Sequence, residues 1–357
     1  MSQNYLILAI NPGSTSTKIG LFKGESEIFT KSISHDSKIL SNFDKITDQY
    51  EFRKDIILRA LQEAKIQITS LNAVVGRGGL IDPIPSGTYS VSEKMLEDLK
   101  TGKNGDHASN LGGILAHAIA TQANCKSFIV DPVVVDELDD IARLSGNPHI
   151  TRKSIFHALN HKAVARLVAK KLGKNYSDLN LIIAHLGGGI SVGIHSKGKV
   201  IDVNNALDGD GPFSPERSGG VPTGQIVNLC FSGKYSEAEI KKQIKGHGGL
   251  VAYLGTNNAS EVSKRFMNGD STAKLVYSAM AYQISKEIGM LSTVVNGKVD
   301  AIALTGGLAR DKIFTDMIKE RISFIANTLI FPGEEEMIAL VQGALRVLNN
   351  EEKPKVY

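Results

Sequence analysis

The fold is decided by the stretch YLILAINPGSTSTKIGLF at positions 5–22. Its apolar run from Tyr5 to Ile10 predicts a buried strand, and the small polar loop NPGSTST follows directly. Lys18 to Phe22 predicts a second strand, which turns at Lys23 to Glu25 into a third strand near Ile28. The chain is therefore expected to open with three strands and a polar loop after the first.

The same order of elements returns in the second half of the chain, in LIIAHLGGGISVGIH at 181–195. A strand at 181–184 leads into the loop HLGGG, a strand at 190–195 follows, and a turn at 196–198 precedes a strand at 199–203. A supersecondary unit at the start of each half is what a duplicated domain produces. Chance recurrence of a hairpin would give the same pattern.

The remaining sequence alternates between helical and strand patterns. Helices are expected at 46–65, 111–122, 154–172 and 340–348, and further strands at 71–75, 127–130 and 299–304. This alternation indicates an α/β architecture. The length of 357 residues suggests two domains, with a boundary near the turn cluster SGNP at 145–148.

Composition narrows the class of protein. A net charge of +4 from scattered basic residues gives no sign of a nucleic-acid or membrane partner. Cys125 and Cys230 lie far apart and predict neither a disulfide framework nor a thiolate metal site. No signal peptide and no apolar run of membrane-spanning length is apparent, so we expect a cytoplasmic protein.

Three loops that follow apolar strands could bind phosphate. NPGSTSTK at 11–18 offers hydroxyls, an amide and a lysine, but lacks the spacing of a P-loop and leads into a strand. HLGGG at 185–189 would let backbone N–H groups approach phosphate oxygens. LTGG at 304–307 precedes a helical stretch whose N-terminus favours anions. Each loop alone could be an ordinary turn, but together they indicate a nucleotide site.

These loops, in this order, resemble the acetate and sugar kinase, heat-shock chaperone and actin superfamily. Within it, SIFHALNH at 154–161 and RSGG at 217–220 resemble the acetate kinase family. The resemblance is closest to butyrate kinases, over VGRGGL at 75–80, HASNLG at 107–112, DPVVVD at 131–136 and FPGEEE at 331–336. It covers essentially the whole chain.

The resemblance implies an α/β fold of two ribonuclease-H-like (actin-like ATPase) domains with a nucleotide cleft between them. The first domain would span 1–148 and take back the C-terminal helix at 337–357, and the second would span 149–336. The implied reaction moves the γ-phosphoryl group of ATP to a short-chain fatty acid, butyrate in the first place. The implied partners are the acid, its acyl phosphate, ATP or ADP, Mg²⁺ and further copies of the same chain.

The resemblance also implies the site residues by position. ATP would be held by Asn11, Ser14, Ser16, Lys18, His185, Gly187, Gly188, Gly189, Gly306 and Gly307. Asp131, His157 and Arg217 match positions at the transferring phosphoryl group, and Glu335, with Asn11, would bind magnesium. A carboxylate acceptor is already ionised at neutral pH, so positive charge and positioning matter more than a general base.

The acid pocket departs from acetate kinases, which have an arginine at the position of Val74 and a histidine at that of Arg77. Arg77 is a candidate to hold the carboxylate, Val74 a candidate apolar wall and His107 a further candidate contact. Each has a second interpretation. Arg77 could form a structural ion pair, Val74 could be core and His107 could be an ordinary loop residue.

Several residues and the acceptor itself allow more than one interpretation. His157 and His161 have the spacing of a metal pair, although no third ligand stands out. Glu334 to Glu336 is a charge run, of which at least two members are expected to be solvated. The acid could instead be isobutyrate, isovalerate, propionate or acetate. A sugar kinase with Asp131 as base, or a nucleotide-gated ATPase, would share the superfamily.

Overall fold

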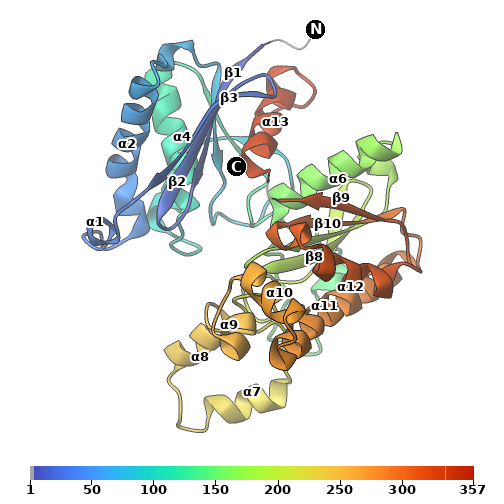
Figure 1. The fold of residues 1–357 in the computed structure, drawn as a ribbon. Coiled ribbons are helices and arrows are strands. Elements are labelled where there is room, and N and C mark those ends of the chain that lie inside the picture. The colour runs from blue at the N-terminus through green and yellow to red at the C-terminus, as the bar shows by residue number, and fades with distance from the viewer. Residues whose placement is uncertain (1–3, 334) are drawn as a thin grey trace. The chain divides into compact units, whose positions relative to one another are not determined.

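The computed structural model describes residues 4–333 and 335–357, and these form two compact units (Figure 1). The first unit comprises Met1–Val135 with Glu335–Tyr357, and the second comprises Asp136–Glu334. The predicted domain boundaries, after positions 148 and 336, lie C-terminal to the two positions at which the chain passes between these units, 135 and 334. The predicted domain limits stay a prediction.

The first unit is built on a six-stranded sheet in the order β3-β2-β1-β4-β6-β5. Strands β1 to β3 are antiparallel, whereas β4 and β6 run parallel to β1. The strands are β1 (Leu6–Pro12), β2 (Ser16–Lys23), β3 (Ser26–Ser34), β4 (Ala73–Arg77), β5 (Thr88–Ser90) and β6 (Lys126–Val130). The helices are α1 (Ser37–Leu40), η1 (Ile46–Gln49), α2 (Tyr50–Glu63), η2 (Ile68–Ser70), α3 (Glu93–Thr101), α4 (Asn110–Ala123) and α13 (Glu336–Leu348).

Helices cover both faces of this sheet. Side chains at alternate positions of β1, such as Leu8 and Ile10, pack against Ile57 of α2 and Leu111 of α4 in one apolar cluster. Helix α13 contacts β1, β4 and β6 and lies apart from α2 and α4 in Figure 1. Burial on both faces explains why β1 and β4 are almost continuously apolar.

The second unit repeats this plan. Its sheet has the order β11-β10-β7-β8-β9, with β7 to β9 antiparallel and β10 and β11 parallel to β7. The strands are β7 (Leu181–Leu186), β8 (Ile190–Ser196), β9 (Lys199–Val203), β10 (Ala301–Gly306) and β11 (Thr328–Pro332). The helices are α5 (Asp140–Arg143), α6 (Ala158–Leu172), η3 (Tyr176–Asp178), α7 (Thr223–Cys230), α8 (Glu237–Ile244), α9 (Gly249–Leu254), α10 (Ala259–Met267), α11 (Ser271–Ser292), η4 (Thr293–Val295), η5 (Gly307–Arg310) and α12 (Lys312–Ile322).

Both sheets therefore begin with the strand, loop, strand, turn and strand that the sequence predicted twice. The α/β fold class is confirmed. Two helix starts were wrong. Helix α13 begins at Glu336, not at position 340. Helix α6 begins at Ala158, not at position 154, and His157 precedes it with φ −78° and ψ 59°. His157 and His161 are therefore not two positions on one helical face.

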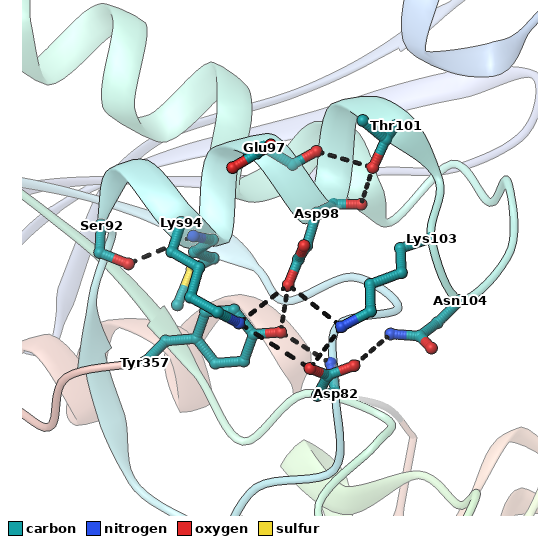
Figure 2. Close-up of polar contacts among 10 residues, drawn as sticks. Asp82, Ser92, Lys94, Glu97, Asp98, Thr101, Lys103, Asn104 and Tyr357 are labelled. Atoms are coloured by element: carbon teal, nitrogen blue, oxygen red, sulfur yellow. Dashed lines mark hydrogen bonds and ion pairs between the residues drawn. The ribbon is translucent and has the colours of Figure 1, made fainter.

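The last residue of the chain, Tyr357, is held against α3 (Figure 2). Its hydroxyl donates to Asp98 Oδ2 at 2.6 Å and accepts from the backbone N–H of Asp82 at 3.0 Å. The Lys94 ammonium lies 4.2 Å from the ring centroid. Burial and the bond to Asp98 raise the pKa of Tyr357 to about 12, so the hydroxyl stays a donor at neutral pH. Among the described helices, none has the length and apolarity to cross a membrane.

Candidate active site

Polar side chains form a row at one edge of the first sheet. Asn11 lies opposite Lys18 in the β1–β2 register, and Ile10 aligns with Gly76, which places Asn11 beside Arg77 at the end of β4. Opposite and aligned neighbours share a face of a sheet, so the three side chains project together. Asn11 and Arg77 lie at the carboxyl ends of parallel strands, where α/β sheets commonly bind ligands.

Glu336, at the start of α13, joins this row. Asn11 Nδ2 donates to Glu336 Oε2 at 2.5 Å, and Arg77 Nη1 lies 3.1 Å from Glu336 Oε1. The side chains of Arg77 and Glu336 are 26% and 14% exposed, so water screens the pair only partly. Arg77 thus has the structural ion pair that was its second interpretation, and contact with an acid stays a prediction.

The charge run at 334–336 is therefore not uniformly solvated. Glu336 is half-buried in the row, whereas Glu335, the predicted magnesium ligand, is exposed just before α13. The metal-binding role of Glu335 stays a prediction. Glu334 lies outside the described residues.

Val74 faces the other way. Its side chain is fully buried in the cluster with Leu8 and Leu115, on the face of β4 opposite to Arg77. The two residues therefore do not form one wall of a common pocket in this unit. The sequence left open that Val74 is a core residue, and the structure places it there.

His107 and Asp131 occupy loops after α3 and β6. His107 is exposed, and its Nδ1 lies 2.8 Å from Ser109 Oγ, next to the start of α4. Asp131 is 2% exposed and has φ 39°, an unusual conformation for a residue other than glycine. Its Oδ1 accepts from the Gly87 N–H at 2.7 Å, which fixes the carboxylate at the end of β6. Backbone strain of this kind is common at functional sites.

A buried arginine that sequence patterns did not single out supports the loop at 11–18. Arg53 of α2 is completely buried and donates to the carbonyls of Gly13, Ser14 and Ser16 at 2.7, 3.0 and 3.1 Å. Burial lowers the pKa of Arg53 to about 10, so it remains charged at neutral pH. The backbone carbonyls of Ser14 and Ser16 are thus fixed by hydrogen bonds from Arg53. The signal in the sequence is that Arg53 falls on the apolar stripe of its helix, four residues before Ile57.

In the second unit the glycine loop carries an arginine. A β-carbon on Gly189 would overlap the guanidinium of Arg217, so only glycine lets this side chain lie on the loop. Arg217 Nη1 donates to the Ala206 carbonyl, and Ser214 Oγ donates to the Gly188 carbonyl at 2.6 Å. The segment that carries Arg217 is therefore fastened to the predicted phosphate loop, Gly187 to Gly189.

The positive charge of Arg217 is only weakly balanced by negative groups nearby. Burial lowers its pKa more than the neighbouring Glu216 raises it, its Nε has no hydrogen-bond partner, and it makes no ion pair within residues 4–333 and 335–357. A partly buried cation without a paired anion is costly unless an anion binds. This site suits a phosphoryl group, which accepts bidentate hydrogen bonds from a guanidinium.

Two of the predicted site residues in the second unit are the histidines His157 and His185. The rings of His157 and His185 are stacked, with centroids 3.8 Å apart and an interplanar angle of 12°. His185 is almost fully buried, and its Nδ1 lies 2.8 Å from Asn160 Oδ1. An amide oxygen accepts only, so we assign the N–H of His185 to Nδ1. The structure thus brings His157 next to His185, the first residue of the HLGGG loop, and the roles that the resemblance implies for them stay a prediction.

The third predicted loop is also built on a special glycine. Gly306, at the end of β10, has φ 90°, and a β-carbon there would overlap the Leu186 carbonyl at the end of β7. The close approach brings the ends of these two parallel strands together. Gly307 follows as an exposed residue that opens η5. Contact with adenosine stays a prediction for both.

Comparisons with known proteins concern the sequence and the overall fold. The sequence profile described as the Acetokinase family matches residues 138–326. Butyrate kinase 2 and butyrate kinase 1 of Clostridium acetobutylicum are each 57% identical to this chain over 353 residues, 99% of this chain and 99% of each relative. The crystal structure of Porphyromonas gingivalis acetate kinase superposes with a TM-score of 0.79 at 18% identity, over 96% of this chain and 100% of that one. At that identity the structural likeness confirms the fold, and the sequence matches decide the family. The chain belongs to the acetokinase family.

Proposed function

We propose that this chain is a carboxylate kinase that transfers the γ-phosphoryl group of ATP to butyrate. A carboxylate oxygen of butyrate forms the new bond to the γ-phosphorus, the bond from that phosphorus to the β,γ-bridging oxygen breaks, and ADP leaves. The names and near-complete coverage of the two Clostridium relatives support this acceptor. The observation that carries the proposal is Arg217, a cation on a glycine loop that pairs with no carboxylate among the described residues.

The residues of the second unit suit the charge problem of this reaction. Acceptor and donor are both anions, so the barrier falls when positive groups surround the phosphoryl oxygens. Arg217 would hold those oxygens, and His157 would donate a hydrogen bond to them. Gly187 to Gly189 would offer backbone N–H groups to the outer phosphates of ATP, and Gly306 and Gly307 would lie along adenosine.

The residues of the first unit would hold the rest of the phosphate chain and the metal. Asn11, Ser14, Ser16 and Lys18 are donors or oxygen ligands on a loop fixed by Arg53. Asp131 would position a metal-bound water or a positive group, since an ionised acceptor needs no base. Arg77 is proposed to bind the acid, with His107 as a further contact.

Magnesium fits the oxygen donors of this unit. Within residues 4–333 and 335–357, no three His, Cys, Asp or Glu side chains gather into a metal site. Mg²⁺ needs no such cluster, because it commonly takes one or two carboxylates together with phosphate oxygens and water. Asn11 and Glu335 would supply protein ligands, with Glu336 adjacent. When bound, magnesium neutralises charge on the phosphate oxygens.

The proposed enzyme acts in the cytoplasm as a homo-oligomer. Three large apolar side chains in and after α7 are exposed, Val227, Phe231 and Tyr235, and Phe231 is 87% exposed. We propose that these side chains contribute to the contact between copies of the chain, because exposed apolar patches commonly mark interaction sites. Sedimentation velocity of the full chain measures the assembly, and a purely monomeric species would reject it.

A product screen tests the proposed reaction. The enzyme is incubated with ATP, Mg²⁺ and hydroxylamine, which converts acyl phosphates to hydroxamates, and with butyrate, isobutyrate, isovalerate, propionate, acetate or a sugar. We expect the most hydroxamate with butyrate and none in excess chelator. ATP turnover with a sugar and no hydroxamate with any acid would reject a carboxylate kinase. A branched or shorter acid that outperforms butyrate would correct the acceptor alone.

A further inference from the structure

Five side chains of the second unit form one continuous chain of polar contacts. Tyr176 OH lies 2.6 Å from His195 Nδ1, and His195 Nε2 lies 3.3 Å from His161 Nδ1. His161 Nε2 lies 2.9 Å from Ser191 Oγ, which is also 2.9 Å from His157 Nδ1. The contacts thus lead from η3 through β8 and α6 to the proposed phosphoryl-contacting histidine. We call Tyr176, His195, His161 and Ser191 the histidine relay.

The inner members of the relay are buried and neutral. His161, His195 and Ser191 are completely buried, and the ammonium of Lys162, next to them, is paired with Glu137 Oε2 at 2.6 Å. Burial lowers the pKa of His161 and of His195 well below its usual value, and the Lys162 charge lowers both further. A neutral imidazole carries one N–H, so one ring nitrogen donates and the other accepts.

Because Ser191 has a single hydroxyl proton, the nitrogen that is protonated in His161 affects which nitrogen is protonated in His157. A serine hydroxyl has one proton and can donate it to only one of the two nitrogens at 2.9 Å. The other nitrogen must then carry the N–H and donate to Oγ. The same holds for the contact between His161 and His195, where one nitrogen must donate to the other. If both nitrogens donated to Oγ, the O–H of the buried Ser191 would have neither of them as an acceptor, which is costly. Two proton arrangements remain that satisfy every contact and also use the Ser191 proton, and they run in opposite directions along the relay.

The contact between Tyr176 and His195 determines which of the two proton arrangements is present. A separation of 2.6 Å is typical of an O–H donor and short for an N–H donor. A phenol, with a pKa of about 10, is also a much stronger hydrogen-bond acid than a neutral imidazole N–H. Tyr176 therefore donates to His195 Nδ1, His195 Nε2–H to His161 Nδ1, His161 Nε2–H to Ser191, and Ser191 O–H to His157 Nδ1. His157 is left with its proton on Nε2.

We propose that Tyr176, His195, His161 and Ser191 are positioning residues that hold His157 as its Nε2-protonated tautomer, so that Nε2–H is the donor offered to the transferring phosphoryl group. The part that concerns the phosphoryl group rests on the proposed function. The opposite arrangement would put the proton on Nδ1 and present a lone pair at Nε2 to an anion, which is repulsive. No proton needs to move along the relay during the reaction.

Nitrogen spectra of the histidines test the relay without substrate. In full-length protein labelled with ¹⁵N-histidine, long-range ¹H–¹⁵N correlations distinguish the two tautomers of each ring, and a His157→Gln sample assigns that residue. We expect wild-type His157 to carry its proton on Nε2. In Tyr176→Phe, His157 should move toward the Nδ1–H form, kcat should fall roughly tenfold, and the KM for ATP should stay within about twofold.

Two further variants separate proton direction from packing. His161→Gln keeps an acceptor and a donor in one planar group and should retain most of the activity, whereas His161→Met fills similar volume without hydrogen bonds and should behave like Tyr176→Phe. The control is Tyr5→Phe in the first unit, which removes a hydroxyl bonded to the Leu348 carbonyl at 3.0 Å and should leave the His157 signals unchanged.

Three results would overturn the proposal. They are a wild-type His157 protonated on Nδ1, a Tyr176→Phe protein with unchanged His157 signals, and equal loss of activity in His161→Gln and His161→Met. A tautomer change with unchanged kcat would remove His157 from the phosphoryl contact. Because the spectra need no turnover, an inactive wild-type protein would reject the proposed function and leave the relay to be judged separately.

Discussion

Arg77 and Glu336, which are far apart in the sequence, form an ion pair of 3.1 Å at the edge of the first sheet. The pair joins the end of β4 to the start of α13, and Asn11 bonds to the same carboxylate at 2.5 Å. An arginine at this position could hold the helix, the acid or both. The kinetics of variants at the two positions can separate these roles.

We expect Arg77→Ala to raise the KM for butyrate at least tenfold and the KM for ATP much less, because a charged hydrogen bond contributes about 1.5–3 kcal/mol. The matched control, Glu336→Gln, breaks the same ion pair but keeps the arginine, so the KM for butyrate should change less. Unchanged acid kinetics in Arg77→Ala would remove Arg77 from the acid site and leave it a structural role. Steady-state kinetics with each substrate varied measure both.

Arg217→Ala should lower kcat roughly a hundredfold while ATP still binds, since the charge acts mainly in the transition state. Binding of ATP is measured directly by calorimetry, and we expect the Kd to stay within about threefold. Arg217→Lys keeps the charge but loses the planar fork and should recover only part of the rate. A kcat of Arg217→Ala within about threefold of wild type would contradict the role on which the proposed function depends.

Arg53→Met should lower the free energy of unfolding by about 2–4 kcal/mol, because buried carbonyls of the loop lose their donor. The loop would lose its support, so the KM for ATP should rise as well. Arg59→Met, at an exposed position of the same helix, is the control and should change little. Denaturant unfolding and kinetics check the two effects. A stable Arg53→Met enzyme with normal ATP kinetics would show that the loop holds itself.

The raised pKa of Glu287 in α11 predicts that the stability of the folded protein depends on pH. Burial and the nearby Asp210 and Asp202 raise the pKa of Glu287 to about 7, against the lowering effect of Arg152. The folded protein thus binds this proton more tightly than the unfolded chain. The contribution is fully present below the unfolded pKa of 4.5 and is lost as the pH rises through 7, a change on the order of 3 kcal/mol.

Glu287→Gln should therefore be more stable than wild type at pH 8 and similar at pH 5. Thermal or urea unfolding at both pH values measures the difference, with Glu320→Gln, at an exposed position of α12, as the control. A wild-type protein that gains relative stability over Glu287→Gln as the pH rises would contradict the sign of this shift.

Local patterns predicted most of the fold. The apolar runs of β1, β4, β7 and β10 identify strands buried on both faces, and polar or glycine-rich loops mark where each ends. The start of α6 was misplaced because SIFH at 154–157 continues the apolar spacing of the helix although its backbone is not helical. Hydrophobic periodicity reports burial, and burial does not stop where a helix ends.

The site was predicted less completely, for physical reasons. Loop glycines and Arg217 belong to short contiguous motifs, so a resemblance could single them out as candidates. Glu336 contacts Asn11 across 325 positions, and Tyr176 contacts His195 between elements that only the tertiary fold brings together. Val74 and Arg77 are separated by an odd number of positions in a strand, which places them on opposite faces. This odd spacing in the sequence is enough to predict that the two side chains do not line one pocket wall.

The most direct test of the central claim is a comparison of kcat/KM for butyrate and for acetate, measured as hydroxamate formed with saturating ATP and Mg²⁺. Burial of two additional methylenes at about 0.8 kcal/mol each predicts a preference for butyrate of roughly 15-fold. Equal values for the two acids would contradict a pocket fitted to a four-carbon acid. The absence of hydroxamate with either acid would contradict a carboxylate kinase altogether.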